Sequence, residues 1–98
     1  MLDHNAAREL VVAWLEGIGK RIEGGLVLIE ERTITKPYGW VFCYTSRRWR
    51  ETGDINHGIA GNGPVVVLAA TDEIVPLGTY APPEEMIAEF EAERGLRG

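Results

Sequence analysis

The chain has 98 residues, a net charge of −5 at pH 7 and 45% hydrophobic residues. This length predicts a single domain over residues 1–98, and the hydrophobic content argues against a disordered chain. The acidic balance argues against a nucleic-acid partner, because an acidic surface repels a phosphate backbone. The lone cysteine, Cys43, cannot form an internal disulfide, which suits a reducing compartment.

Membrane insertion and secretion are not expected. The longest apolar run, residues 65–70, is far shorter than the ~20 residues that a membrane span needs. The N-terminal stretch carries Asp3 and His4 and lacks the pattern of a signal peptide. We therefore expect a soluble cytoplasmic protein with no membrane partner.

Residues 3–18 predict an amphipathic helix. Apolar residues recur there at the i, i+3, i+4, i+7 spacing of one helix face: Ala7, Leu10, Val11, Trp14, Leu15 and Ile18. Asp3 or Asn5 is placed to accept a hydrogen bond from the first free amides. Gly17 and Gly19 supply the stop signals.

The next two segments predict strands that form a hairpin. Residues 26–36 are rich in β-branched side chains, and a change of pattern near Glu30 predicts a twist or bulge midway. Pro37 should end this strand. In the second strand, residues 40–45, even-numbered aromatic residues should share one face of the sheet: Tyr38, Trp40, Phe42 and Tyr44.

Two further strands and a helix complete the pattern. Residues 65–70 are apolar on both faces and should be central, whereas Pro76 makes residues 73–77 an edge strand. Pro82 and the acids that follow it predict a helix through about residue 94. The order predicts an α+β fold: an N-terminal helix, a four-stranded antiparallel meander and a C-terminal helix, with both helices packed on one face.

No catalytic or metal-binding constellation is evident. Cys43 and His57 are a thiol–imidazole pair to consider, but Cys43 lies between Phe42 and Tyr44, where a cysteine is commonly a small buried hydrophobe. The histidines and the cysteine lack the spacing of zinc ligands. The glycines of residues 58–63 lack the phosphate-loop pattern and favour a tight turn before Pro64. We therefore expect neither an enzyme nor a cofactor.

The long connection of residues 46–63 carries a basic cluster on an otherwise acidic chain. Its members are Arg47, Arg48, Trp49 and Arg50. One interpretation is a solvated strand end with a half-buried tryptophan. The other is a binding hot spot, because Trp and Arg dominate such sites. The acids Glu30, Glu31, Glu51 and Asp54 could pair with these arginines and weaken the second interpretation.

Four blocks of sequence together resemble a known family. They are T-I-x-K-x-x-G-W-V-F-x-Y at residues 33–44, E-T-G-D at 51–54, G-N-G-P-V-V-V at 61–67 and L-G-T at 77–79, before a proline-led acidic helix. This order resembles the bacterial immunity proteins of the polymorphic-toxin type, numbered thirty-five (YrhB-like). One departure is the third hairpin, where Thr71-Asp72-Glu73 replaces the T-G turn that the family often carries.

The resemblance implies a small intracellular, non-enzymatic protein that binds and neutralises a toxin encoded nearby, and peptidase-type toxins are among those associated with the family. It also implies a chaperone-like protein as an alternative, and a small Cys/His hydrolase is a more remote one. The candidate partner-binding residues are Arg47, Arg48, Trp49, Arg50, Glu51 and Asp54. The family-motif residues that we expect to define the fold are Gly39, Trp40, Phe42, Tyr44, Gly61, Asn62, Gly63, Pro64, Gly78 and Thr79.

Overall fold

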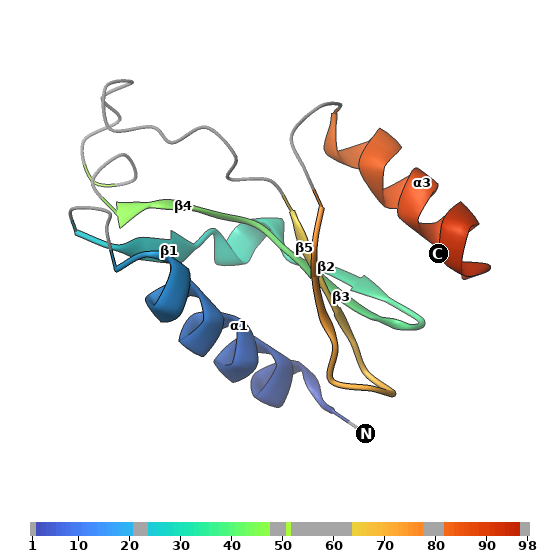
Figure 1. Ribbon diagram of the computed structural model, residues 1–98, viewed down its shortest axis with the longest axis horizontal. Coiled ribbons are helices and arrows are strands. Elements are labelled where there is room, and N and C mark those ends of the chain that lie inside the picture. Colours follow the sequence, from blue (N-terminus) through green and yellow to red (C-terminus); the bar gives the residue numbers. More distant parts are fainter. Residues whose placement is uncertain (1, 21–23, 48–50, 52–63, 78–81, 97–98) are drawn as a thin grey trace.

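The computed structural model describes residues 2–20, 24–47, 51, 64–77 and 82–96, and it has the predicted α+β architecture (Figure 1). An N-terminal helix, a four-stranded antiparallel sheet and a C-terminal helix follow one another along the chain. The elements are α1 (His4–Ile18), β1 (Leu26–Leu28), the 3₁₀ helix η1 (Glu30–Arg32), β2 (Ile34–Lys36), β3 (Gly39–Phe42), β4 (Tyr44–Ser46), β5 (Val65–Leu68), β6 (Ile74–Pro76) and α3 (Pro83–Arg94).

Helix α1 begins and ends where the sequence predicts. The Asp3 carboxylate accepts a hydrogen bond of 2.8 Å from the Ala6 N–H, which satisfies one of the free amides of the first turn. At the other end the Gly19 N–H donates to the Leu15 carbonyl. The buried stripe consists of Ala7, Val11 and Leu15. Ile18 is not part of it, because its side chain is 44% exposed.

The sheet is an antiparallel meander with strand order β2-β3-β5-β6. Val41 of β3 is paired with Ile34 on one side and with Val66 on the other, and Val66 is paired in turn with Val75 of β6. Strand β5 is therefore internal, as its apolar sequence predicted. Strand β6 is an edge strand, which explains why Pro76 is tolerated there.

The first hairpin is long, bent and interrupted. β1 pairs with β4 through Leu28 and Tyr44, and β2 pairs with β3 through Ile34 and Val41. Five residues separate Leu28 from Ile34, whereas two separate Val41 from Tyr44, so the first strand carries three extra residues. They are accommodated by η1, which confirms the break expected near Glu30. The matching interruption at Cys43, between β3 and β4, was not predicted.

The two helices cover opposite faces of the sheet, so the prediction that both pack on one face is wrong (Figure 1). The core on the α1 side contains Phe42, Val65 and Val67. The core on the α3 side contains Val41 and Val66, packed with Ile87 and Phe90 of the helix. Alternate side chains of a strand point to opposite faces, so each internal strand contributes to both cores.

Three of the four even-numbered aromatic residues share the α1 face as predicted. Trp40, Phe42 and Tyr44 belong to the core on that side, and Trp40 lies 6.3 Å from the His4 ring, centroid to centroid. The prediction is wrong for Tyr38, which packs with Phe90 on the α3 face. Tyr38 lies in the turn between β2 and β3, where the strand alternation does not apply.

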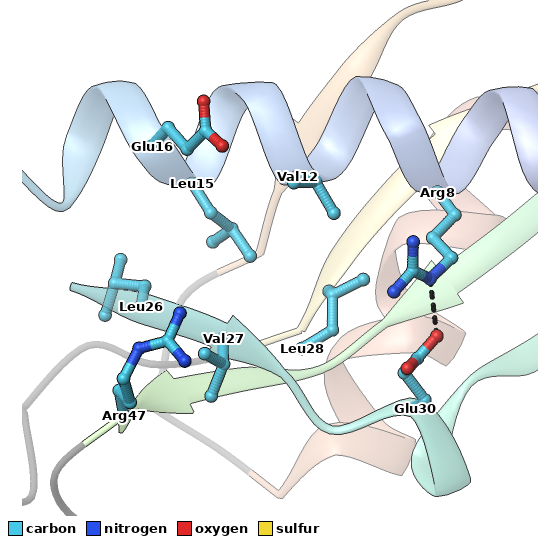
Figure 2. A pocket seen from close by; sticks show the side chains of 9 residues that line it. All are labelled: Arg8, Val12, Leu15, Glu16, Leu26, Val27, Leu28, Glu30 and Arg47. Atoms are coloured by element: carbon cyan, nitrogen blue, oxygen red, sulfur yellow. Dashed lines mark hydrogen bonds and ion pairs between the residues drawn. The ribbon is translucent and has the colours of Figure 1, made fainter. Parts of the chain in front are cut away.

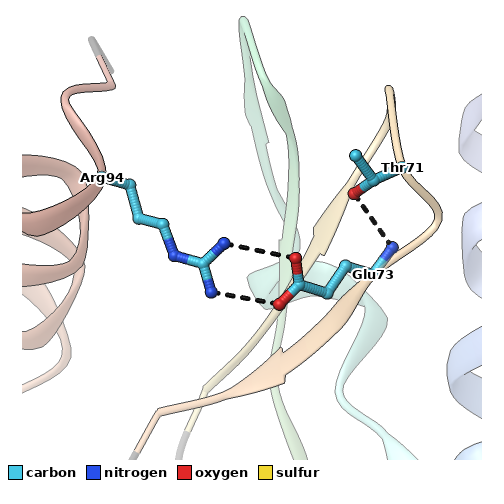
Figure 3. A network of polar contacts seen from close by, with 3 residues as sticks. All are labelled: Thr71, Glu73 and Arg94. Carbon is cyan, nitrogen blue, oxygen red and sulfur yellow. Dashed lines mark hydrogen bonds and ion pairs between the residues drawn. The ribbon is translucent and has the colours of Figure 1, made fainter.

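Helix α3 is attached to the sheet by its last turns. The Arg94 guanidinium donates two hydrogen bonds, of 3.2 and 3.1 Å, to the two oxygens of the Glu73 carboxylate (Figure 3). The Tyr38 hydroxyl donates to Glu91 at 2.8 Å, and Lys36 forms an ion pair with the same carboxylate at 3.2 Å. These contacts join α3 to the β2–β3 turn and to the start of β6.

The turn between β5 and β6 explains the departure from the family pattern. Asp72 has φ 61°, in the left-handed region that glycine occupies most readily. Aspartate is one of the few other residues that tolerate this region. The Leu68 carbonyl accepts a hydrogen bond from the Asp72 N–H, and the Leu68 N–H donates to Glu73. Asp72 thus occupies the left-handed position that the glycine of a T-G turn would suit.

Candidate partner-binding surface

A groove of about 320 Å³ lies between helix α1 and strand β1 (Figure 2). Both walls supply apolar side chains, because α1 and β1 face each other across the end of the α1-side core. The charged groups are arranged around this aliphatic centre. We call this feature the α1–β1 groove; its lining residues are Arg8, Val12, Leu15, Glu16, Leu26, Val27, Leu28, Glu30 and Arg47.

Arg47, at the strand side of the groove, is held in place by two hydrogen bonds. Its backbone N–H donates to the Gly25 carbonyl at 3.0 Å, and its side-chain Nε donates to the Gly24 carbonyl at 3.0 Å. Gly24 has φ 80° and Gly25 has φ 74°, a conformation that other residues rarely adopt. In this conformation the carbonyls of both glycines point toward Arg47. Figure 2 shows the guanidinium beside Leu26 and Val27.

The charge at the opposite end of the groove is compensated internally. Arg8 donates from Nε to the Glu30 carboxylate, which joins α1 to η1. This hydrogen bond lowers the pKa of Glu30 and raises the pKa of Arg8. Both side chains are exposed, so solvent screens the pair. Of the residues that the structure describes, Glu16 and Arg47 are the other charged ones that line the groove.

A second depression, of about 240 Å³, continues the groove toward the segment that the sequence indicated. It shares Val27, Leu28 and Arg47 with the α1–β1 groove and adds the exposed Glu51. Arg47 therefore lies where the two hollows meet.

The structure brings two of the six candidate binding residues to this surface, Arg47 and Glu51. Arg48, Trp49, Arg50 and Asp54 lie outside the described residues. Ser46 is 1% exposed and cannot present its side chain to a partner, so the exposed part of the segment begins at Arg47. Of the acids considered as partners for these arginines, Glu30 pairs with Arg8.

The groove itself was missed because it exists only after α1 is laid on β1. Residues 26–28 are apolar on both faces of the strand. This pattern indicates that one face packs on the core and that the other presents an apolar surface. The sequence contained no comparable signal for the contribution of Val12 or Glu16.

The family-motif residues in the described part of the chain belong to the sheet and its core. Gly39 and Pro64 are buried, Phe42 and Tyr44 lie in the α1-side core, and Trp40 packs against that core. The corner expected at Gly61, Asn62 and Gly63 lies outside the described residues, as do Gly78 and Thr79.

Cys43 and His57 cannot be compared as a pair, because His57 lies outside the described residues. Cys43 is half-buried, and this burial raises the pKa of its thiol, with the nearby Arg32 acting weakly in the opposite direction. Among the residues that the structure describes, no three His, Cys, Asp or Glu side chains form a group able to hold a metal ion. No helix in the described part of the chain has the length and apolar character to cross a membrane.

The fold and the groove together describe a small α+β domain with an aliphatic groove beside an arginine that is held by two hydrogen bonds. The chain belongs to the immunity protein 35 family, whose model matches residues 5–92.

The chain is also similar to "Uncharacterized protein YrhB" of Escherichia coli (strain K12), with 38% identity over 60 residues, or 61% of this chain. The match spans 64% of the length of YrhB. No solved structure matches the chain.

Proposed function

We propose that this protein binds a cognate bacterial toxin and neutralises it by occupying the toxin stoichiometrically. The observation that carries the proposal is the match to immunity protein 35 over residues 5–92. An inhibitor of this kind needs only a surface complementary to its target, because it holds the target and performs no chemistry on it. The family suggests a protein that is not an enzyme, and it implies a toxin as the partner.

The class of the toxin is a finer proposal. Peptidase-type toxins are among those associated with the immunity family that the chain resembles. We therefore propose a peptidase domain as the first target to test. The cytoplasm, where a toxin-producing cell needs protection, is the proposed place of action.

The segment that follows β4 supports a contact role for the predicted cluster. Arg47 directly follows β4 and is held by two hydrogen bonds to the turn before β1, so a rigid scaffold supports the base of this segment. Trp49 stays a predicted anchor. Its removal should weaken toxin binding strongly, since truncating such an anchor typically costs ~2 kcal/mol or more, about thirtyfold in affinity.

A growth experiment tests the proposal. The toxin domain encoded beside this gene is expressed from an inducible promoter in a sensitive bacterium, with or without this protein. We expect growth arrest with the toxin alone and growth when both are present. Continued arrest in the presence of well-expressed, folded protein would contradict the proposal.

No observation in the described part of the chain favours the chaperone-like alternative. It would need an exposed apolar patch of several hundred Å². In the described part of the chain the exposed large apolar side chains are Ile18 and Ile34, which belong to α1 and β2 respectively. We therefore retain toxin binding as the proposed function.

A further inference from the structure

We propose that the α1–β1 groove is the docking site for the toxin, and that it receives an apolar side chain that lies next to a carboxylate recognised by Arg47. The inference rests on the proposed function and deepens it, because it names both the surface and the chemistry of the part of the toxin that binds there.

The size and floor of the groove define the first half of the occupant. About 320 Å³ is at the low end of the range for small-molecule sites, and it provides room for one or two protein side chains. The centre is lined by aliphatic groups, among them Val12, Leu15 and Leu28. Such a floor favours an apolar side chain, because water is displaced from apolar surface on both partners.

The end of α1 lies close to Leu26, one of the residues that line the groove. A Cβ atom added to Gly19 would lie 3.2 Å from the Leu26 Cγ and 3.3 Å from the Leu26 nitrogen, so the helix end already approaches β1 closely. Figure 2 shows Leu26 toward one end of the groove and the Arg8–Glu30 pair toward the other. The short distance between these ends favours a short segment of the toxin with one central anchor.

Arg47 defines the second half of the occupant. Among the described residues it is the charged one that lines both hollows. Its Nε donates a hydrogen bond to the Gly24 carbonyl, which fixes the plane of the guanidinium. The forked terminal donors of a fixed guanidinium match a carboxylate. Glu16 and Glu51 each line one hollow and are exposed, so solvent screens their repulsion of that carboxylate.

The charges around the groove predict the direction in which each substitution changes the affinity for the toxin. If the toxin places a carboxylate at Arg47, removing Arg47 weakens binding and neutralising Glu16 strengthens it. If the toxin places a basic group in the groove, both effects reverse. The two substitutions therefore distinguish the proposed occupant from its opposite.

The experiment is a titration of the full-length protein against the toxin domain encoded beside its gene. The variants are Arg47→Ala, Arg47→Lys, Glu16→Gln and Val12→Trp, the last of which fills the groove from the helix side. Arg32→Ala is the matched control, because Arg32 is an exposed arginine of η1 that does not line the groove. Circular dichroism and thermal melting check that each variant is folded.

We expect Arg47→Ala and Val12→Trp to weaken binding about thirtyfold or more, as for central anchors. Arg47→Lys should weaken binding by a smaller factor, because it keeps the charge and loses the fork. Glu16→Gln should tighten binding by about twofold to fivefold, the size of a screened charge effect, and Arg32→Ala should bind like the wild type.

Wild-type affinity in folded Arg47→Ala and Val12→Trp proteins would overturn the proposal, as would weaker binding by Glu16→Gln. Arg47→Ala removes the clamp on the turn at residues 24–25, so Glu16→Gln and Val12→Trp provide the test if that variant is unstable. Binding by the wild type is measured first. Its absence would contradict the proposed function, whereas wild-type binding that the groove variants leave unchanged would contradict only the groove.

Discussion

Gly39 occupies a position in the sheet that a side chain cannot share. Its φ is 156°, and a Cβ atom built on it would lie 1.9 Å from the backbone carbonyl oxygen of Val67 on the neighbouring strand. Because that oxygen belongs to the backbone of an internal strand, it cannot move aside without disturbing the ladder. The glycine of the G-W pair in the family motif thus permits the close approach of β3 to β5.

Gly39→Ala should lower the free energy of unfolding by ~2 kcal/mol or more, since it adds both a clash and backbone strain. Gly17→Ala is the matched control. Gly17 lies inside α1, and an added Cβ would meet nothing within 4 Å. That change should stabilise the protein by about 0.5 kcal/mol, because alanine favours the helix. Urea unfolding measures both, and an unchanged midpoint for Gly39→Ala would refute this account of the strand contact.

Cys43 should be an unreactive thiol. Burial raises the pKa of its thiol, so the nucleophilic thiolate is scarce at neutral pH. We expect a thiol reagent to label the native protein much more slowly than the urea-unfolded protein at the same pH. A folded Cys43→Ser variant should retain toxin binding. Native labelling as fast as that of the unfolded chain would revive the hydrolase alternative.

At the scale of elements, the sequence predicted the type and order of the helices and strands. It did not predict that α1 and α3 cover opposite faces of the sheet. The cap at Asp3, the internal β5 and the edge position of Pro76 follow from local rules of side-chain chemistry. The face of the sheet that α3 covers does not follow from such local rules. The sequence nevertheless indicated that both faces are covered, because β5 is apolar on both sides.

The attachment of α3 predicts a specific dependence of stability on pH. Burial, together with the hydrogen bond that Tyr38 donates to Glu91, raises the pKa of Tyr38 above its ordinary value of about 10. The folded protein thus keeps the phenol proton where the unfolded chain loses it. The contribution of Tyr38 is complete below pH ~10 and declines as the pH rises above that value.

Tyr38→Phe isolates this contribution, because the other titrating groups remain in both proteins. The variant should be less stable at pH ~8, since it leaves the Glu91 carboxylate without the phenol donor. The difference in unfolding free energy between the two proteins should then narrow from about pH 10 upward. Urea unfolding at several pH values measures it, and a constant difference would show that the Tyr38 hydroxyl does not bind its proton more tightly in the fold.

At the scale of the whole molecule, the two helices have different relations to the sheet. Helix α3 is bonded to the β2–β3 turn and to Glu73. Helix α1 lies over the other face of the sheet (Figure 1), and its side chains line the groove together with those of β1. The sequence pointed to Arg47 and Glu51 because of their neighbours in the chain. It could not point to Val12 or Glu16, because these join the surface only through the packing of α1 on β1.

The central claim is that this protein neutralises a toxin by binding it, and calorimetric titration with the purified toxin domain from the adjacent gene tests it most directly. We predict a one-to-one complex with a dissociation constant on the order of micromolar or below, as specific protein interfaces show. Toxin activity should fall in proportion to the protein added and vanish at equivalence. A toxin that remains fully active beside an excess of the folded protein, with no heat of binding, would contradict the account.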